Sequence, residues 1–183
     1  MNSTFLLMTI VPLLAFAIAD AMGGLKTGVV VAVVFSVALF GVNWMMLGFF
    51  EPTSLIEPIF FLVLGLISLR LKNGLWFKFQ PVVVNTLSAI LLAGYQIAGQ
   101  PLLVKYAPAM DKLMPPENQG VLTDPRMLDK LSNVSHGLIY MLLVHAAWVA
   151  WVALKKSNWA WVGARLAGYP LLILTVVFIM LAI

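Results

Sequence analysis

Residues 29–50, VVVAVVFSVALFGVNWMMLGFF, decide the class of fold, because this stretch is long, apolar and free of charged side chains. About 20 apolar residues are enough for an α-helix to cross the hydrocarbon core of a bilayer. The whole chain has the same character, since 62% of its 183 residues are hydrophobic and 10% are charged. A soluble domain has about 25% charged residues. The sequence therefore predicts an all-α polytopic membrane protein that has lipid as its main solvent.

Four further apolar segments are predicted to be full spans, bounded by proline, glycine or basic residues. They cover residues 59–71, 82–104, 131–154 and 159–183. Residues 5–19 are also apolar, but this segment is short for a span and contains Pro12. We expect it to be an uncleaved membrane helix that either crosses or re-enters the bilayer. The predicted architecture is five full transmembrane helices plus this short N-terminal segment, or six if it spans.

Residues 105–130 interrupt the apolar pattern. They hold four of the seven acidic residues and the proline-rich run MPPENQG at 114–120. We expect an external loop here, and Asp124 followed by Pro125 is typical of the N-cap and first turn of a helix. Because no repeat covers the chain, residues 1–183 are predicted to form a single integral membrane domain.

Basic residues are divided unequally between the two sides that these spans define. One side receives seven Lys and Arg residues and a single acid, Asp20. Arg165 is counted on this side together with the turn that contains Lys155 and Lys156. The other side receives four basic residues and six acids. Because Lys and Arg mark the cytoplasmic side of short loops, the link at 70–80 and the turn at 155–158 are predicted to be cytoplasmic. The loop at 105–130 and the C-terminus are then external.

Residues suited to catalysis or metal binding are scarce. The chain has no cysteine, which excludes thiol catalysis, thiolate metal sites and disulfides. No Asp, Glu, Lys or Arg is predicted to lie in the middle of a span, which argues against a proton relay. His136 and His145 fall on roughly opposite faces of one helix and cannot share a metal, so His145 is expected to be a hydrogen-bonded packing residue. No catalytic residue, metal or cofactor is therefore predicted.

Polar residues form one stripe along the segment 82–104. Asn85, Ser88, Gln96 and Gly99 stand at offsets of 0, 3, 11 and 14 residues. In lipid, such a stripe must face protein or a wet cavity, because its hydrogen-bonding groups have to be satisfied. We expect hydrogen bonds between helices here. The alternative is a path for a substrate, which would make the chain a small transporter or a lipid translocator.

The link at 70–80 combines basic and aromatic side chains. Arg70, Lys72 and Lys78 lie within nine residues, and Trp76 stands among them. Such a cluster at the cytoplasmic face is typical of a positive-inside signal with an aromatic anchor. It also suits a site for anionic lipid headgroups, since each basic residue near an anionic surface contributes about 1 kcal/mol. Nucleic-acid binding is not expected, because the basic residues lie in short loops between spans.

Five short motifs, spread over nearly the whole chain, together resemble a known bacterial family. They are PLLAF at 12–16, GLWFKFQPV at 74–82, QPLL at 100–103, LSN at 131–133 and WAWV at 159–162. The second is similar to an FxKxKPT link, and the third to a KPLL motif, of the inner-membrane septation protein A family, also called YciB or IspZ. The chain departs from that pattern because Gln80 and Gln100 replace lysines and its outer loop is long and rich in proline.

The resemblance implies a multi-pass protein of the bacterial inner (cytoplasmic) membrane that supports cell envelope integrity, membrane homeostasis and cell division without catalysis. It also implies association with membrane proteins of cell elongation and division. Membrane lipids are expected partners, and a homo-oligomer is left open. A third hypothesis, an intramembrane enzyme acting on lipid precursors, would require a histidine or carboxylate beside a cavity at headgroup depth.

Overall fold

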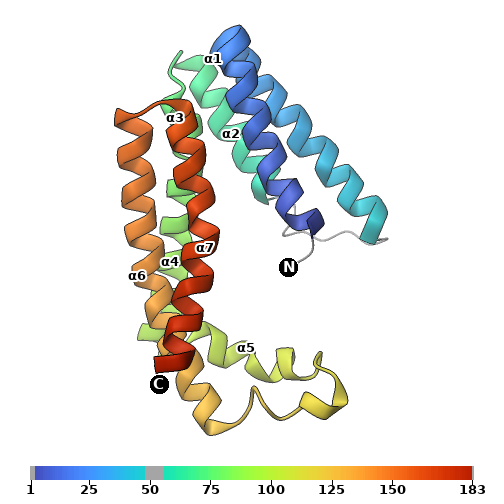
Figure 1. The fold of residues 1–183 in the computed structure, drawn as a ribbon, viewed down its shortest axis with the longest axis vertical. Coiled ribbons are helices and arrows are strands. Elements are labelled where there is room, and N and C mark those ends of the chain that lie inside the picture. Colours follow the sequence, from blue (N-terminus) through green and yellow to red (C-terminus); the bar gives the residue numbers. More distant parts are fainter. Residues whose placement is uncertain (1–2, 48–55, 183) are drawn as a thin grey trace. The chain divides into compact units, whose positions relative to one another are not determined.

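Every secondary-structure element is helical in the part of the chain that the computed structural model describes, residues 3–47 and 56–182. The elements are α1 Ser3–Leu47, α2 Ile56–Arg70, α3 Leu75–Lys78, α4 Gln80–Ile97, α5 Leu102–Asp111, the 3₁₀ turn η2 Pro116–Asn118, α6 Pro125–Lys155 and α7 Asn158–Ala182 (Figure 1). No strand occurs in these described ranges, so the prediction of an all-α protein is confirmed.

Four stretches of the described residues are long and apolar enough to cross a membrane. They are Leu14–Val42, which a turn at Gly24 divides, Leu75–Ile97, Pro125–Lys155 and Asn158–Ala182. The prediction of five or six full spans is therefore not confirmed. Helix α2 has 15 residues, or about 22 Å at 1.5 Å per residue, and is shorter than a hydrocarbon core of about 30 Å. The last three residues of the span predicted at 29–50 lie outside the described residues.

The chain divides into two compact units. Unit 1 comprises Met1–Pro81 and Val149–Leu166, and unit 2 comprises Val82–Trp148 and Ala167–Ile183. Helices α6 and α7 each contribute residues to both units. Each unit has its own buried side chains, and each is described separately below.

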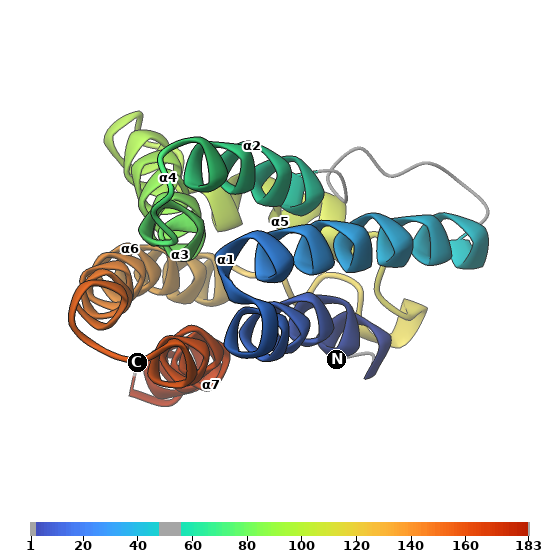
Figure 2. The ribbon, with the colours of Figure 1, turned by 90° about the horizontal axis from the view of Figure 1, so that it is seen from above.

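In unit 1, α1 consists of two helical halves that lie side by side (Figures 1 and 2). The chain turns at Gly24, whose φ of 76° and ψ of 177° are not helical. Glycine adopts positive φ without steric cost. A Cβ atom at Gly28 would lie 2.8 Å from Asp20 Cβ, so a second glycine allows the two halves to approach closely. Residues 20–28, which lie between the predicted segments 5–19 and 29–50, are therefore helical on both sides of Gly24.

An aromatic cluster fills the core of unit 1. The rings of Phe16 and Phe77 stack with their centroids 4.3 Å apart, and the ring of Trp161 meets Phe16 edge-on at 5.7 Å. All three side chains are fully buried, so the cluster joins α1, α3 and the first turn of α7. Beside it, a Cβ atom at Gly65 would lie 2.7 Å from a methyl carbon of Val29, which shows how closely α1 and α2 pack.

In unit 2, α4, most of α6 and the second part of α7 run along one another, and α5 runs across them (Figure 1). Gly137 of α6 leaves room for the side chain of Ile179 of α7, where a Cβ atom would clash. Lys130 Nζ donates a hydrogen bond of 2.9 Å to the carbonyl oxygen of Met180. This bond ties the beginning of α6 to the last turn of α7, where the helix dipole also stabilises a cation.

Helix α4 ends at Ile97, so the span predicted at 82–104 is wrong at its C-terminal end. Gly99 has a φ of 73°, and Pro101 has no N–H group with which to continue the helix. Gly99 therefore lies outside the helix that carries the polar stripe. Residues 102–104, which were expected in this span, begin α5 instead.

The segment between α5 and α6 is folded around one buried carboxylate. Asp111 accepts hydrogen bonds from the backbone N–H groups of Gly120, at 2.7 Å, and Leu122, at 3.0 Å. Asp124 Oδ1 accepts the N–H of Arg126 at 2.9 Å, so the predicted N-cap of α6 is confirmed. The loop expected at 105–130 therefore contains most of α5, the turn η2 and the start of α6.

Candidate functional site

Three turns of the chain meet at one end of unit 1: the turn at Gly24, the link between α2 and α4, and the turn between α6 and α7 (Figure 1). The amide of Asn158 donates a hydrogen bond to the carboxylate of Asp20. Trp161 Nε1 donates to the carbonyl oxygen of Lys78 at 2.9 Å. We call this region the basic end. Its basic residues are Lys26, Arg70, Lys72, Lys78, Lys155 and Lys156.

Local hydrogen bonds fix the link between α2 and α3. The N–H of Asn73 donates to the carbonyl oxygen of Ser68, and the N–H of Leu75 donates to Asn73 Oδ1, each at 2.9 Å. Lys72 has a φ of 49°, the left-handed conformation that commonly follows the C-terminus of a helix. These bonds end α2 at Arg70 and direct the chain into α3.

The four predicted headgroup residues differ in exposure. Arg70, Lys72 and Trp76 are exposed, and they lie at the surface of the basic end. Lys78, at the end of α3, is less exposed than these three because it is partly buried, and it interacts electrostatically with Asp20. The first three side chains are therefore better placed than Lys78 to contact a ligand from outside.

Exposed tryptophans accompany the basic residues of unit 1. Trp76, Trp151 and Trp159 are all exposed. Lys156 Nζ lies 5.3 Å from the centroid of the Trp151 ring, within the range of a cation–π interaction. Tryptophan is enriched where a protein passes from hydrocarbon to headgroups, and lysine and arginine attract anionic headgroups. The basic end thus offers both kinds of contact that a lipid headgroup region requires.

Arg165 lies inside α7 and is buried, which contradicts its assignment to the last basic turn. Its Nη1 donates to Gln80 Oε1 at 2.5 Å, and the two side chains are 8% and 3% exposed. Arg165 follows the buried Trp161 by four positions, so helical periodicity places both on one face. The spacing is visible in the sequence, but it indicates burial of Arg165 only once the structure shows that Trp161 is buried.

The polar stripe on α4 meets protein within unit 2 at Asn85. Asn85 Nδ2 lies 2.8 Å from Nδ1 of His145 on α6, at hydrogen-bonding distance. Ala89 and Leu92 lie between Asn85 and Gln96 on the same helical face, and both are buried. Packed apolar side chains therefore interrupt the stripe.

The remaining polar residues of unit 2 have mixed surroundings. Ser88 is partly buried, and Gln96 Oε1 is a buried acceptor without a hydrogen-bond partner among the described residues. His145 is buried against Gly168 of α7, where a Cβ atom would lie 2.5 Å from the imidazole ring, whereas His136 is exposed. The described ranges contain no group of three or more His, Asp or Glu side chains that could hold a metal ion.

A pocket that the sequence did not predict lies beside the start of α6 in unit 2, with a volume of about 420 Å³. Its lining residues are Gln119, Gly120, Val121, Asp124, Arg126, Met127 and Lys130. The pocket depends on the way Asp111 draws the chain back toward α5, which no local motif indicates. One carboxylate and two cations line it, so its charge does not select one class of ligand.

Comparison with models of protein families matches residues 5–183 to the family described as Intracellular septation protein A. Curated proteins named Inner membrane-spanning protein YciB, from Coxiella burnetii, are also similar. The one from strain RSA 331 / Henzerling II is 28% identical over 169 residues, which is 92% of this chain and 86% of the relative. The one from strain Dugway 5J108-111 is 30% identical over 93 residues, which is 51% of each chain. No solved structure matches the chain.

Proposed function

The chain belongs to the intracellular septation protein A family, and from this premise we propose that it supports envelope integrity, membrane homeostasis and cell division. It acts without catalysis, in the inner membrane, alongside membrane proteins of cell elongation and division. The basic end is its working surface and binds anionic lipid headgroups. These bound lipids hold the chain in a fixed orientation, and its protein partners dock on it in that orientation.

The exposed side of the basic end is the observation that supports this proposal. Arg70 and Lys72 are exposed next to Trp76, on a link that local hydrogen bonds hold in place. The acidic side chain of this region, Asp20, is engaged by Asn158. Each basic residue near an anionic surface contributes about 1 kcal/mol, so Arg70 and Lys72 together contribute about 2 kcal/mol. That energy is enough to retain a lipid and to orient the protein.

The same charges place the basic end on the cytoplasmic side in this proposal, because Lys and Arg in short loops stay inside. The segment 105–130 and the C-terminus then lie outside. A reporter enzyme that is active only outside the cytoplasm, fused after Ile183, should be active. Activity from a cytoplasm-only reporter at the same position would reverse the proposed orientation.

Transport or lipid translocation along α4 is the alternative, and the packing of the stripe weighs against it. A translocation path needs a continuous polar lining, whereas Ala89 and Leu92 are buried between its polar residues. Asn85 has His145 as a neighbour at hydrogen-bonding distance. In this proposal the stripe therefore serves the packing of helices. Hydrogen bonds between membrane helices contribute roughly 0.6 kcal/mol each on average.

Complementation of a deletion strain tests the proposed function. The wild-type gene should restore normal septation, and Arg70→Gln combined with Lys72→Gln should restore it poorly although the protein still reaches the membrane. Arg126→Gln is the control, because it removes an exposed guanidinium from unit 2 and should complement like the wild type. Full complementation by the double variant would contradict the role of the basic end. A deletion without any septation or envelope defect would contradict the function itself.

A further inference from the structure

Helix α5 differs from its neighbours in unit 2 by its direction, since it runs across the others (Figure 1). It begins at Leu102, and only residues 98–101 separate it from Ile97, the end of a stretch long enough to span a membrane. A helix attached so closely to the end of a span starts at the depth where the chain leaves the hydrocarbon core. Its side chains therefore decide whether it turns toward water or lies along the membrane.

The side chains of α5 and of the turn that follows it divide into an exposed apolar side and a buried side. Tyr106, Met110 and Leu113 are 50%, 51% and 86% exposed. Spacings of four and three residues place them on one face. Ala107 and Asp111 lie on the other side and are buried, and Asp111 holds the following segment by its two hydrogen bonds. These three side chains thus form an apolar side of α5 that the described residues leave half or more exposed.

Two lysines flank this apolar side. Lys105 and Lys112 are exposed and stand next to Tyr106 and Leu113 in the sequence. Lys105 Nζ lies 4.8 Å from the centroid of the Tyr95 ring, so the start of α5 is held against the end of α4. Tyrosine and lysine at the end of a span are typical of the membrane–water interface.

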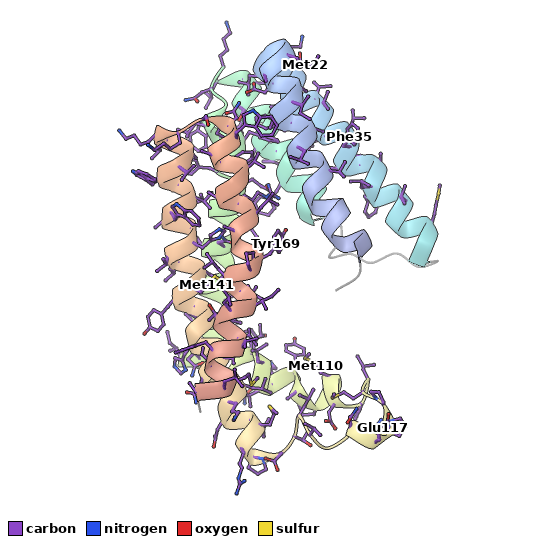
Figure 3. All side chains as sticks on the ribbon, in the orientation of Figure 1. Met22, Phe35, Met110, Glu117, Met141 and Tyr169 are labelled. Carbon is purple, nitrogen blue, oxygen red and sulfur yellow. The ribbon has the colours of Figure 1, made fainter. Side chains whose placement is uncertain are left out.

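We propose that α5 is an interfacial helix, with its apolar side inserted into the leaflet beside which α4 ends and with Lys105 and Lys112 on anionic headgroups. An exposed apolar face bordered by cations is the pattern of helices that lie in the plane of a membrane. The segment that follows carries exposed polar residues, Glu117 among them, and reaches into water; Figure 3 labels Met110 on α5 and Glu117 beyond it. Because α5 is attached directly to the end of α4, its apolar face lies at the depth of the lipid. Lipid therefore covers this face, and no protein partner is required.

Because the chain has no cysteine, a single introduced thiol reports on one position. Met110→Cys and Leu113→Cys place a spin label on the apolar side, and Glu117→Cys is the matched control in the loop. The three proteins are reconstituted in vesicles of phosphatidylethanolamine and phosphatidylglycerol. Accessibility to oxygen, which concentrates in lipid, is compared with accessibility to a water-soluble nickel chelate.

We expect the ratio of oxygen to nickel accessibility to be several-fold higher at positions 110 and 113 than at 117. Equal ratios at all three positions would show that α5 lies in water and would overturn the proposal. Protection of 110 and 113 from both reagents would show that protein covers this face, and would overturn it equally. These exposed positions tolerate substitution, and an unchanged melting temperature of each variant shows that it is folded.

The role of the lysines is tested with the label at position 113. Lys105→Gln combined with Lys112→Gln should make the label shallower in the vesicles that contain phosphatidylglycerol. In vesicles of phosphatidylcholine alone, the double variant and its parent should give the same depth. An unchanged depth in both kinds of vesicle would contradict the assignment of the lysines to anionic headgroups. The basic end of unit 1 is untouched in these variants, so the result is independent of the proposed function.

Discussion

Position 80 shows how one buried charge constrains a neighbouring residue. The guanidinium of Arg165 carries only hydrogen-bond donors, and Gln80 supplies an acceptor to it within unit 1. A lysine at position 80, as in the motif that the sequence resembles, would put a second cation where the acceptor now lies. The amide is therefore the side chain that suits a chain with a buried arginine at 165.

We predict that Gln80→Lys lowers the free energy of unfolding in detergent by about 1.5–3 kcal/mol, the usual cost of losing a hydrogen bond to a charged group. Gln100→Lys makes the same chemical change at an exposed position and should alter stability by less than about 0.5 kcal/mol. Thermal unfolding of both variants in one detergent measures the difference. Equal destabilisation by the two substitutions would contradict the assigned role of Gln80.

The contact between α6 and α7 depends on a residue without a side chain. We predict that Gly168→Ala destabilises unit 2 by about 1–3 kcal/mol, because the added Cβ atom would meet the ring of His145. Gly163→Ala in the same helix meets no atom within 4 Å and should be neutral or stabilising, since alanine favours helices. Melting temperatures of the pair decide the matter, and a stabilised Gly168→Ala protein would show that the helices are not in contact there.

At the scale of elements, the segment after α5 is held by Asp111. We predict that Asp111→Ala leaves the N–H groups of Gly120 and Leu122 without their acceptor, and so speeds hydrogen exchange and proteolysis between α5 and α6. Glu117→Gln, in the exposed turn η2, is the control and should leave both rates unchanged. Unchanged exchange in Asp111→Ala would mean that other contacts hold this segment.

The boundaries of the helices could be predicted where a local signal fixes them. Asp124 and Pro125 mark the start of α6 because capping involves only neighbouring residues. The end of α4 was misplaced because Gly99 and Pro101 lie within an apolar run, where hydropathy hides a change of direction. Most of α5 was expected as loop, because the acidic residues and prolines of the segment 105–130 interrupt the apolar pattern and hide a helix shorter than a span. Arg165 was misplaced because its burial depends on Gln80, 85 residues away.

For the whole molecule, composition predicted the membrane class and the all-α fold, because both follow from an excess of apolar residues. It could not predict that three turns far apart in the sequence meet at the basic end, since tertiary packing of Phe16, Phe77 and Trp161 brings them together. The candidate headgroup residues were found from their local spacing. Their exposure, and the partial burial of Lys78, depend on that packing.

Native mass spectrometry of the protein released from nanodiscs with anionic and zwitterionic lipids tests the binding of headgroups by the basic end most directly. The wild type and Arg126→Gln should each retain one anionic lipid per subunit. Arg70→Gln combined with Lys72→Gln should lose it, because both exposed cations beside Trp76 are gone. Equal retention of anionic lipid by the wild type and the double variant would contradict the account.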